Sequence, residues 1–475
     1  MLTAMGFATI GVVLVLLLSN RVSAVVALIG VPVAAALVAG FSPAEIGTFA
    51  GDGITGVATT AAMFVFAILY FGVMSDAGLF APVVRRVLRF AGSNPVTIAV
   101  ATVVLAMATH LDGAGATTFL ITIPAMIPLY DALGMRRVVL AALTGLGAGV
   151  MNLMPWGGPT ARAATATGVP ANELWIPLIP AQAVGVLACL AIAFLIGHRE
   201  RARLAAVATA TATETEPVSA GAGAGVSAGT GAGAGAAAGP RPGSAGGDGS
   251  GTASGPVEDS EAALLRRPRV YWFNVALTVA TVAALIAGVM PPELLFMLAL
   301  VIALVVNYPG LSAQTDRVNA HARGAMLMAS TLLAAGVFLG VMENSGMIEA
   351  MATALTGAMP AAIGPGLPLF VGVLAVPLSL LFGPDAYYFA VMPVLSAVGA
   401  TFGVGAESIA QASIIGEETV GFPISPMTGS FYLLTGLAGV PIGTHIRFLL
   451  PWAWLVSLIM LAVALATGVI PLWAG

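Results

Sequence analysis

The chain has 475 residues, of which 59% are hydrophobic and 8% are charged, and its formal net charge is −4. Soluble domains carry about 25% charged residues, so this composition excludes an ordinary soluble protein and indicates a polytopic membrane protein. The few charges are spread too thinly to suggest a nucleic-acid partner.

The first apolar runs lie near 3–19, 23–40 and 57–75, and each is long enough for a membrane-spanning helix. The run at 3–19 has no basic segment before it and no small-residue cleavage site, so we expect a retained span. Only arginine can indicate which loops face the cytoplasm, because the chain has no lysine. The segment GFSPAEIGTFAGDG (40–53) has no arginine and is expected to be an outside loop.

Two apolar arms, near 95–111 and 116–134, are joined by HLDGAGATT. Arginines flank both outer ends, namely Arg85, Arg86 and Arg89 on one side and Arg136 and Arg137 on the other. Both ends therefore face the cytoplasm, and we expect a re-entrant helical hairpin at 95–134 with a glycine-rich tip inside the membrane. The alternative is two full spans with an ordinary outside loop.

The stretch VMNLMPWGGPTARA (150–163) interrupts the next apolar element, at 137–170. Its Pro-Trp-Gly-Gly-Pro core is a poor helix former, so the sequence predicts a broken transmembrane helix. A span at 172–197 follows, in which Cys189 is expected to serve in packing. Residues 204–265 are mostly Ala, Gly, Ser, Thr and Pro and predict a disordered linker, placed in the cytoplasm by the arginines around it.

The second half follows the same rules. Spans are expected near 271–289, 293–306 and 326–342, and 448–470 closes the chain. Between them lie a hairpin at 366–404, whose arms are joined by FGPDAYY, and a broken helix at 407–440. No arginine flanks this hairpin, so it is expected to enter from outside.

An internal repeat relates the two halves. FGVMSDAGLF (71–80) matches LGVMENSGMI (339–348), and PWGGPT (155–160) matches PISPMT (423–428), both at an offset of 268 residues. The two copies run in opposite directions, so the sequence predicts inverted repeats at 1–203 and 266–475, an architecture of secondary transporters. The predicted fold is an all-α polytopic membrane protein with two re-entrant hairpins and two broken transmembrane helices.

The two breaks predict the substrate site. Unwound backbone frees N–H groups, and a restarting half-helix exposes an N-terminus that suits a carboxylate. The residues expected to bind substrate at the breaks and at the first tip are Asn152, Gly157, Gly158, Thr160, Arg162, Ser425, Thr428, Gly429, Gly113 and Ala114. A kinked packing helix is the alternative.

Charged residues at membrane depth are functional candidates. Asp112 and Asp385, at the hairpin tips, could ligate a hard cation or cap a helix. Arg162 could grip a carboxylate, cap carbonyls or pair with an acid. Glu417 and Glu418 are expected to carry protons, with a structural hydrogen bond as the rival, and His110 is expected to be satisfied structurally.

MFVFAILYFGVMSDAGLF, LDGAGATTFLITIPAMIPLY and GVMNLMPWGGPTARA closely resemble the citrate–divalent-metal complex:proton symporter (CitMHS) family of the ion transporter superfamily. The resemblance covers nearly the whole chain apart from the linker. It implies proton-driven uptake of citrate bound to a divalent metal ion, by an elevator motion of a homodimer in the cell membrane, without a permanently bound cofactor. It maps the tips to Asp112–Ala116 and Gly383–Ala386, and the broken helices to Asn152–Arg162 and Ser425–Ser430.

The chain departs from the Ser-Asn-Thr tip motifs of that superfamily, having DGAGAT and GPDAYY instead, which suggests that it lacks a sodium site of the dicarboxylate type. Oxygen ligands serve Mg²⁺ and Ca²⁺ alike, so the residues do not select the metal. The rival functions are transport of another organic anion, ion antiport, an intramembrane hydrolase using His110 and Asp112, and a channel.

Overall fold

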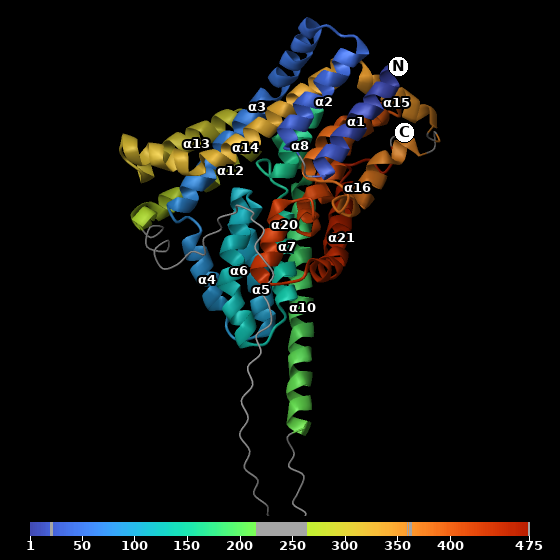
Figure 1. The fold of residues 1–475 in the computed structure, drawn as a ribbon. Helices are drawn as coiled ribbons and strands as arrows, with labels where there is room; N and C mark the ends of the chain where they lie inside the picture. Colours follow the sequence, from blue (N-terminus) through green and yellow to red (C-terminus); the bar gives the residue numbers. More distant parts are fainter. Residues whose placement is uncertain (20–21, 215–263, 359, 361–362, 474–475) are drawn as a thin grey trace, which may run out of the picture.

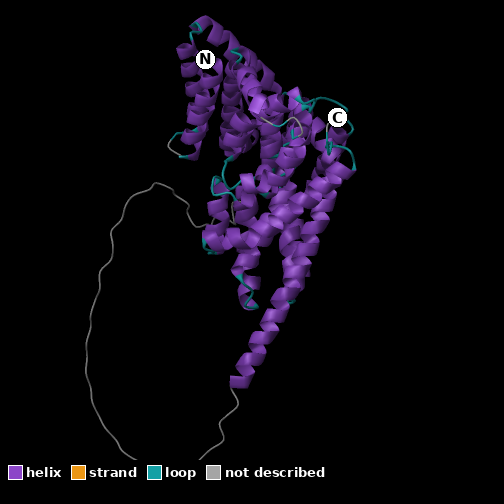
Figure 2. Ribbon diagram, turned by 90° about the vertical axis from the view of Figure 1, so that its right-hand side faces the viewer, coloured by secondary structure: helices purple, strands orange, loops and turns teal. Residues whose placement is uncertain are grey.

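The computed structural model describes all residues of the chain except 20–21, 215–263, 359, 361–362 and 474–475. Within the described residues every regular element is helical (Figure 2). Six described helices are long and apolar enough to cross a membrane, and shorter apolar helices of 10–17 residues accompany them. The prediction of an all-α polytopic membrane protein is confirmed.

The first half contains α1 (Leu2–Leu18), α2 (Ala24–Ala39), α3 (Pro43–Asp76), α4 (Ala81–Ala91), α5 (Pro95–Thr109), η1 (His110–Asp112), α6 (Gly115–Ala132), α7 (Arg137–Met151), α8 (Gly158–Thr167), α9 (Ala171–Trp175), η2 (Ile176–Leu178) and α10 (Ile179–Glu214). The second half contains η3 (Pro268–Val270), α12 (Tyr271–Ile286), α13 (Pro292–Asn307), α14 (Leu311–Asn344), α15 (Met347–Ala358), η4 (Gly364–Gly366), α16 (Leu367–Leu378), α17 (Pro384–Ala386), η5 (Tyr387–Val391), α18 (Met392–Thr401), α19 (Ala406–Ile415), η6 (Gly416–Val420), η7 (Phe422–Ile424), α20 (Gly429–Ala438) and α21 (Ile442–Ala466).

The long helices α3 and α14 carry the repeat. Both have 34 residues, and their first residues, 43 and 311, differ by the offset of 268 that the sequence motifs show. They lie side by side and antiparallel (Figure 1). Gly53 meets Gly336 near one end, where a Cβ on either glycine would overlap the other backbone. At the opposite end Asp76 bonds Arg317 and His321, at 3.0 and 2.8 Å. The antiparallel packing of these two helices agrees with the inverted repeat, which stays a prediction for the rest of the two halves.

The expected outside loop at 40–53 is wrong, because the chain is helical from Pro43 onwards. Ser42 and Glu45 form a capping box: the Ser42 hydroxyl accepts the Glu45 N–H at 3.3 Å, and the Glu45 carboxylate accepts the Ser42 N–H at 2.8 Å. Proline at the first position also suits a helix start. A polar, glycine-containing helical segment therefore has the composition of a loop while its caps specify a helix.

The arms of the first expected hairpin pack against each other, whereas α16 and α18 of the second both pack on α19. In the first, α5 and α6 are joined by hydroxyl–hydroxyl bonds of 3.1 Å from Thr102 to Tyr130 and from Thr109 to Thr122. Together with η1, α5 forms the segment Pro95–Asp112, which is one of the six helices long enough to cross a membrane. Helix length therefore does not decide between a re-entrant hairpin and two full spans, and the hairpin stays a prediction. The arms of the second hairpin are α16 and α17–α18, of which α16 has 12 residues.

The predicted linker begins later than expected. Helix α10 continues past Arg203 to Glu214, so residues 204–214 are helical, and α10 extends far beyond the rest of the bundle (Figure 1). The remainder of the expected linker, 215–263, lies outside the described residues. Cys189, on α10, is fully buried against α7, where its thiol lies 3.8 Å from the Leu146 carbonyl oxygen, as its packing role requires.

Candidate functional site

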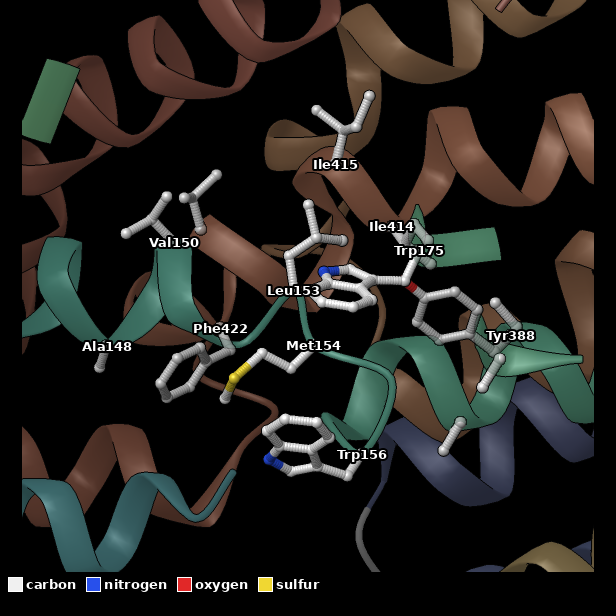
Figure 3. Packing of buried hydrophobic residues seen from close by; sticks show 14 of the residues in the cluster. Ala148, Val150, Leu153, Met154, Trp156, Trp175, Tyr388, Ile414, Ile415 and Phe422 are labelled. Carbon is white, nitrogen blue, oxygen red and sulfur yellow. The ribbon is translucent and has the colours of Figure 1, made fainter. Parts of the chain in front are cut away.

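The first break joins α7 to α8 through residues 152–157, and protein atoms surround it. The Trp156 ring stacks on Phe71 with centroids 4.9 Å apart, and its indole N–H donates to the Leu111 carbonyl at 2.9 Å. Leu153 and Met154 are buried along the extended segment between the two half-helices (Figure 3). The break is thereby tied to the tip of the first hairpin, and a packed environment of this kind tolerates unwound backbone in a membrane.

The two breaks meet at Asn152. Its side-chain amide donates to the carbonyl oxygen of Glu418 in the second break at 2.8 Å, and Asn152 is buried. Gly157 is the N-cap of α8, and a Cβ there would overlap the Asn152 carbonyl oxygen, so the turn requires glycine. The Asn152 amide therefore connects the first break directly to the second.

The expected pairing of Thr160 with Thr428 is wrong. Thr428 is the N-cap of α20, the position that Gly157 holds in α8, so at this point the offset between the halves is 271, three residues more than 268. Thr160 is the third residue of α8, with its hydroxyl buried and unpartnered among the described atoms. The Thr428 hydroxyl donates to the Phe422 and Ser425 carbonyls at 3.2 and 3.1 Å. The offset increases from 268 to 271 because the second break is longer than the first.

A cavity of about 190 Å³ lies between the breaks and the hairpin tips. Its lining residues are His110, Gly113, Gly115, Asn152, Gly158, Pro159, Arg162, Met328, Pro384, Glu418, Phe422, Thr428 and Ser430. Both tips, both breaks and α14 thus contribute to one space, as the sequence predicts for all of them except α14.

Three helices begin at this cavity. Gly115 starts α6, Gly158 starts α8, and Ser430 is the second residue of α20, and all three residues line the cavity. The N-cap residues of these helices make no side-chain cap hydrogen bond. First-turn N–H groups without caps and three converging positive helix ends make an anion-binding environment.

Arg162 reaches from α8 to the tip of the second hairpin. Its Nε donates to Asp385 Oδ1 at 2.7 Å, and its Nη1 donates to the Gly158 carbonyl at 3.1 Å. The side chains of Arg162 and Asp385 are 14% and 23% exposed. The arginine thus makes both of the structural contacts that the sequence allowed, and it still lines the cavity.

The two glutamates occupy the second break. Glu418 lines the cavity and has a positive φ of 53°, which is unusual for a residue with a side chain. Glu417 is fully buried, and its Oε2 accepts the Ser379 hydroxyl at 3.0 Å, while Tyr388 donates to its backbone carbonyl at 2.8 Å. The Oε1 atoms of both glutamates are buried without a hydrogen-bond partner among the described atoms.

Of the remaining candidates, His110 and Gly113 line the cavity. Asp112 Oδ1 accepts the Ala114 N–H at 2.9 Å, a bond within the tip turn that does not cap the first turn of α6. Gly113, with φ of +75°, forms the tip between them and lines the cavity. His110 Nδ1 bonds the Thr118 hydroxyl at 2.8 Å, whereas its buried Nε2 has no partner among the described atoms. Asp112, Ala114, Thr160, Ser425, Gly429, Gly157, Asp385 and Glu417 are not among the lining residues.

Sequence reasoning missed several lining residues. Phe422 precedes the mapped range of the second break and could have been found by extending that range towards the N-terminus, whereas Ser430 is the last residue of the range. Met328 comes from α14, and Ser379, which holds Glu417, comes from the first arm of the second hairpin. Neither carries a sequence signal, because their relevance depends on packing between distant segments.

These features define a class: a helical membrane transporter, with two half-helix breaks and two hairpin tips around a central cavity. The family model described as "Citrate transporter" (CitMHS) matches residues 13–416, so the chain belongs to the CitMHS citrate transporter family, which is a family of transporters and not of enzymes.

Two relatives agree with this assignment, and a solved structure shares the fold. The chain is 40% identical over 470 residues to a Bacillus subtilis (strain 168) protein named "Citrate transporter", covering 99% of this chain and 100% of that protein. It is 38% identical over 473 residues to a "Mg(2+)/citrate complex secondary transporter" of the same organism, covering 99% of each. The Alcanivorax borkumensis YdaH transporter has a similar fold, with a TM-score of 0.51 at 16% identity, covering 91% of this chain and 89% of that one.

Proposed function

We propose that this protein takes up citrate as a complex with a divalent metal ion such as Mg²⁺ or Ca²⁺, together with protons, across the cell membrane. The observation that carries the proposal is the Arg162–Asp385 ion pair beside a cavity onto which three uncapped helix N-termini open. The relative named for a Mg²⁺–citrate complex supports the same substrate class.

The ion pair suits a ligand that carries both signs of charge. A carboxylate of the complex would take the place of Asp385 on the Arg162 guanidinium, in a charge-assisted contact. The freed Asp385 would then face the metal ion, a hard cation that prefers oxygen ligands. Free citrate would leave Asp385 without a partner, and an unpaired, partly buried charge is costly. Metal dependence of binding follows from this exchange.

Citrate would supply most of the metal ligands. Among the described residues, no group of three or more His, Cys, Asp and Glu side chains could hold a metal ion. Asp385 is bonded to Arg162, which lines the cavity, whereas Asp112 is engaged in its own turn, so of the two predicted metal ligands Asp385 lies nearer to the proposed substrate. We therefore place the ion with the substrate and not in a resident site.

Proton coupling is assigned to the glutamates. Glu418 lines the cavity, and an ionised carboxylate there would repel an anionic complex, so substrate should bind most tightly when Glu418 carries a proton. Glu417 adjoins it and has one carboxylate oxygen without a partner among the described atoms, which makes it a second proton acceptor. Substitution of Glu418 by Gln should leave binding of the complex intact and reduce the protons moved per citrate.

Movement is proposed to follow the elevator scheme of a homodimer. The paired α3 and α14, with α2, α12 and α13 against them, would form the fixed scaffold. The hairpins, broken helices and cavity would move as one body, since their contacts are mostly with each other. In this scheme the repeats at 1–203 and 266–475 each contribute half of both parts, and the 204–265 linker joins them in the cytoplasm.

The test is uptake of labelled citrate into proteoliposomes with an imposed proton gradient. Uptake should require Mg²⁺ or Ca²⁺, should stop in excess EDTA, and should acidify the lumen. Equal uptake with and without metal would contradict the substrate, and uptake without proton movement would contradict the coupling. Competition by other di- and tricarboxylates separates citrate from the alternative, another organic anion.

A further inference from the structure

A second cavity, of about 360 Å³, lies away from the proposed substrate site, where α3, α4, α6 and the start of the second half meet. Its walls include Asp76, Phe80, Val84, Arg85, Ile121 and Arg266. Arg85 and Arg266 are 181 positions apart in the sequence, yet their side chains reach the same space. The other named walls, apart from Asp76, are hydrophobic. The cavity therefore combines an apolar interior with two guanidinium groups.

The acidic wall residue does not cancel these charges. Asp76 is already bound by Arg317 Nη1 at 3.0 Å and by His321 Nε2 at 2.8 Å, both from α14. The backbone beside Arg266 is also held against the end of α3, since the Arg267 N–H donates to the Ala77 carbonyl at 2.9 Å. Arg85 and Arg266 are exposed and thus remain available to an anion.

The surroundings place this cavity at a membrane–water interface. Helix α4 is amphipathic: Val84, Val87 and Leu88 pack against the core while its arginines are exposed. Phe90, on the same helix, is 68% exposed, and Trp272, a few residues after Arg266, is 78% exposed. Exposed aromatic side chains beside arginines are typical of the headgroup level of a bilayer.

We infer that the cavity between α3, α4 and α6 binds an anionic phospholipid, whose phosphate contacts Arg85 and Arg266 while an acyl chain lies along Phe80, Val84 and Ile121. Charge complementarity selects the headgroup, and the apolar walls select a lipid over a free anion. Because the cavity spans the end of α3, the connecting helix α4 and α6 of the first hairpin, a bound lipid would join the scaffold to the part that carries the substrate cavity. The site does not depend on which substrate is transported.

The test uses the full-length protein, purified in detergent and titrated with dioleoyl phosphatidylglycerol, with retained lipid counted by native mass spectrometry. The wild type should retain one phosphatidylglycerol in preference to dioleoyl phosphatidylcholine. The double variant R85Q/R266Q should weaken that binding by roughly 30-fold, as expected for two arginines near a headgroup. The matched control R323Q/R447Q removes two exposed arginines elsewhere and should retain the lipid.

Ala81→Phe adds an independent readout, because Ala81 lines the cavity and the larger side chain fills it without removing a charge. It should also lower lipid retention. Unchanged melting temperatures would show that the variants are folded. Equal retention of phosphatidylcholine, equal losses in the two double variants, or displacement by millimolar inorganic phosphate would each overturn the inference, the last by assigning a site for a free anion.

Discussion

Replacing Asp385 by Asn tests the exchange of ion-pair partners on which the proposed function rests. The substitution keeps the shape of the side chain and removes its charge, so Arg162 is left without its anionic partner at 2.7 Å. In the proposed exchange, binding of free citrate takes Arg162 away from Asp385 and leaves that carboxylate unpaired. If this is why metal is needed, the variant should bind free citrate better than the wild type does. If Asp385 only closes the hairpin tip, the preference for the metal complex should persist.

The size of the effect follows from burial. Exposed ion pairs contribute about 0–1 kcal/mol, and breaking a fully buried pair costs about 3–5 kcal/mol. The side chains of Arg162 and Asp385 are 14% and 23% exposed, so the free energy of this pair lies between the values for exposed and buried pairs, at about 2 kcal/mol. That free energy corresponds to roughly a 30-fold change in affinity. We therefore expect the ratio of citrate affinities with Mg²⁺ and with EDTA to fall by about that factor.

The assay is isothermal titration calorimetry of purified protein with citrate, in saturating Mg²⁺ and in EDTA. Arg162→Gln should weaken binding in both conditions, because it removes the group that receives the carboxylate. Asp131→Asn is the matched control, since it breaks another 2.7 Å arginine–aspartate pair, with Arg137, that is exposed and far from the cavity. An Asp385→Asn protein with the full wild-type preference for the metal complex would refute the exchange.

Three further predictions follow from the geometry. Thr428→Val should weaken citrate binding about fivefold or more, because it removes a hydroxyl that lines the cavity and bonds two carbonyls of the second break. Thr160→Val should leave affinity unchanged and preserve or raise the melting temperature, since its buried hydroxyl has no partner among the described atoms. Gly53→Ala should destabilise the α3–α14 pair by about 1–3 kcal/mol in denaturant unfolding, while Gly51→Ala, which meets open space on the same helix, should not; equal stability of the two would contradict the close approach. Deleting about 40 residues from 215–255 should leave uptake intact, because the Ala/Gly/Ser-rich composition predicts a connection whose length matters little, and loss of uptake at normal expression would assign that segment a role.

The sequence was sufficient for features that are repeated or locally encoded. The 268-residue offset, read from two short motifs, recurs in the bounds of α3 and α14. The break after Asn152 follows from residues that cannot continue a helix. Composition alone predicted a loop at 40–53, but the capping box of Ser42 and Glu45 starts α3 there.

Contacts between distant segments could not be predicted in the same way. The sequence allowed three roles for Arg162 and could not show that Asp385, 223 residues away, would be its partner. A constant offset likewise could not reveal the three extra residues of the second break, which move Thr428 to a cap position. Both outcomes depend on how the crossing breaks pack, and one sequence holds no measure of that packing.

Under the proposed function, proton coupling also accounts for a carboxylate beside an anion site. The complex of citrate with a divalent ion retains about one negative charge, which three helix N-termini and Arg162 can balance only if Glu418 adds no charge of its own. A proton on Glu418 would then raise affinity for the substrate, and by linkage the substrate would raise affinity for the proton by the same factor. Under the proposed function, the carboxylate that disfavours substrate binding when ionised is the group that obliges substrate and proton to bind together.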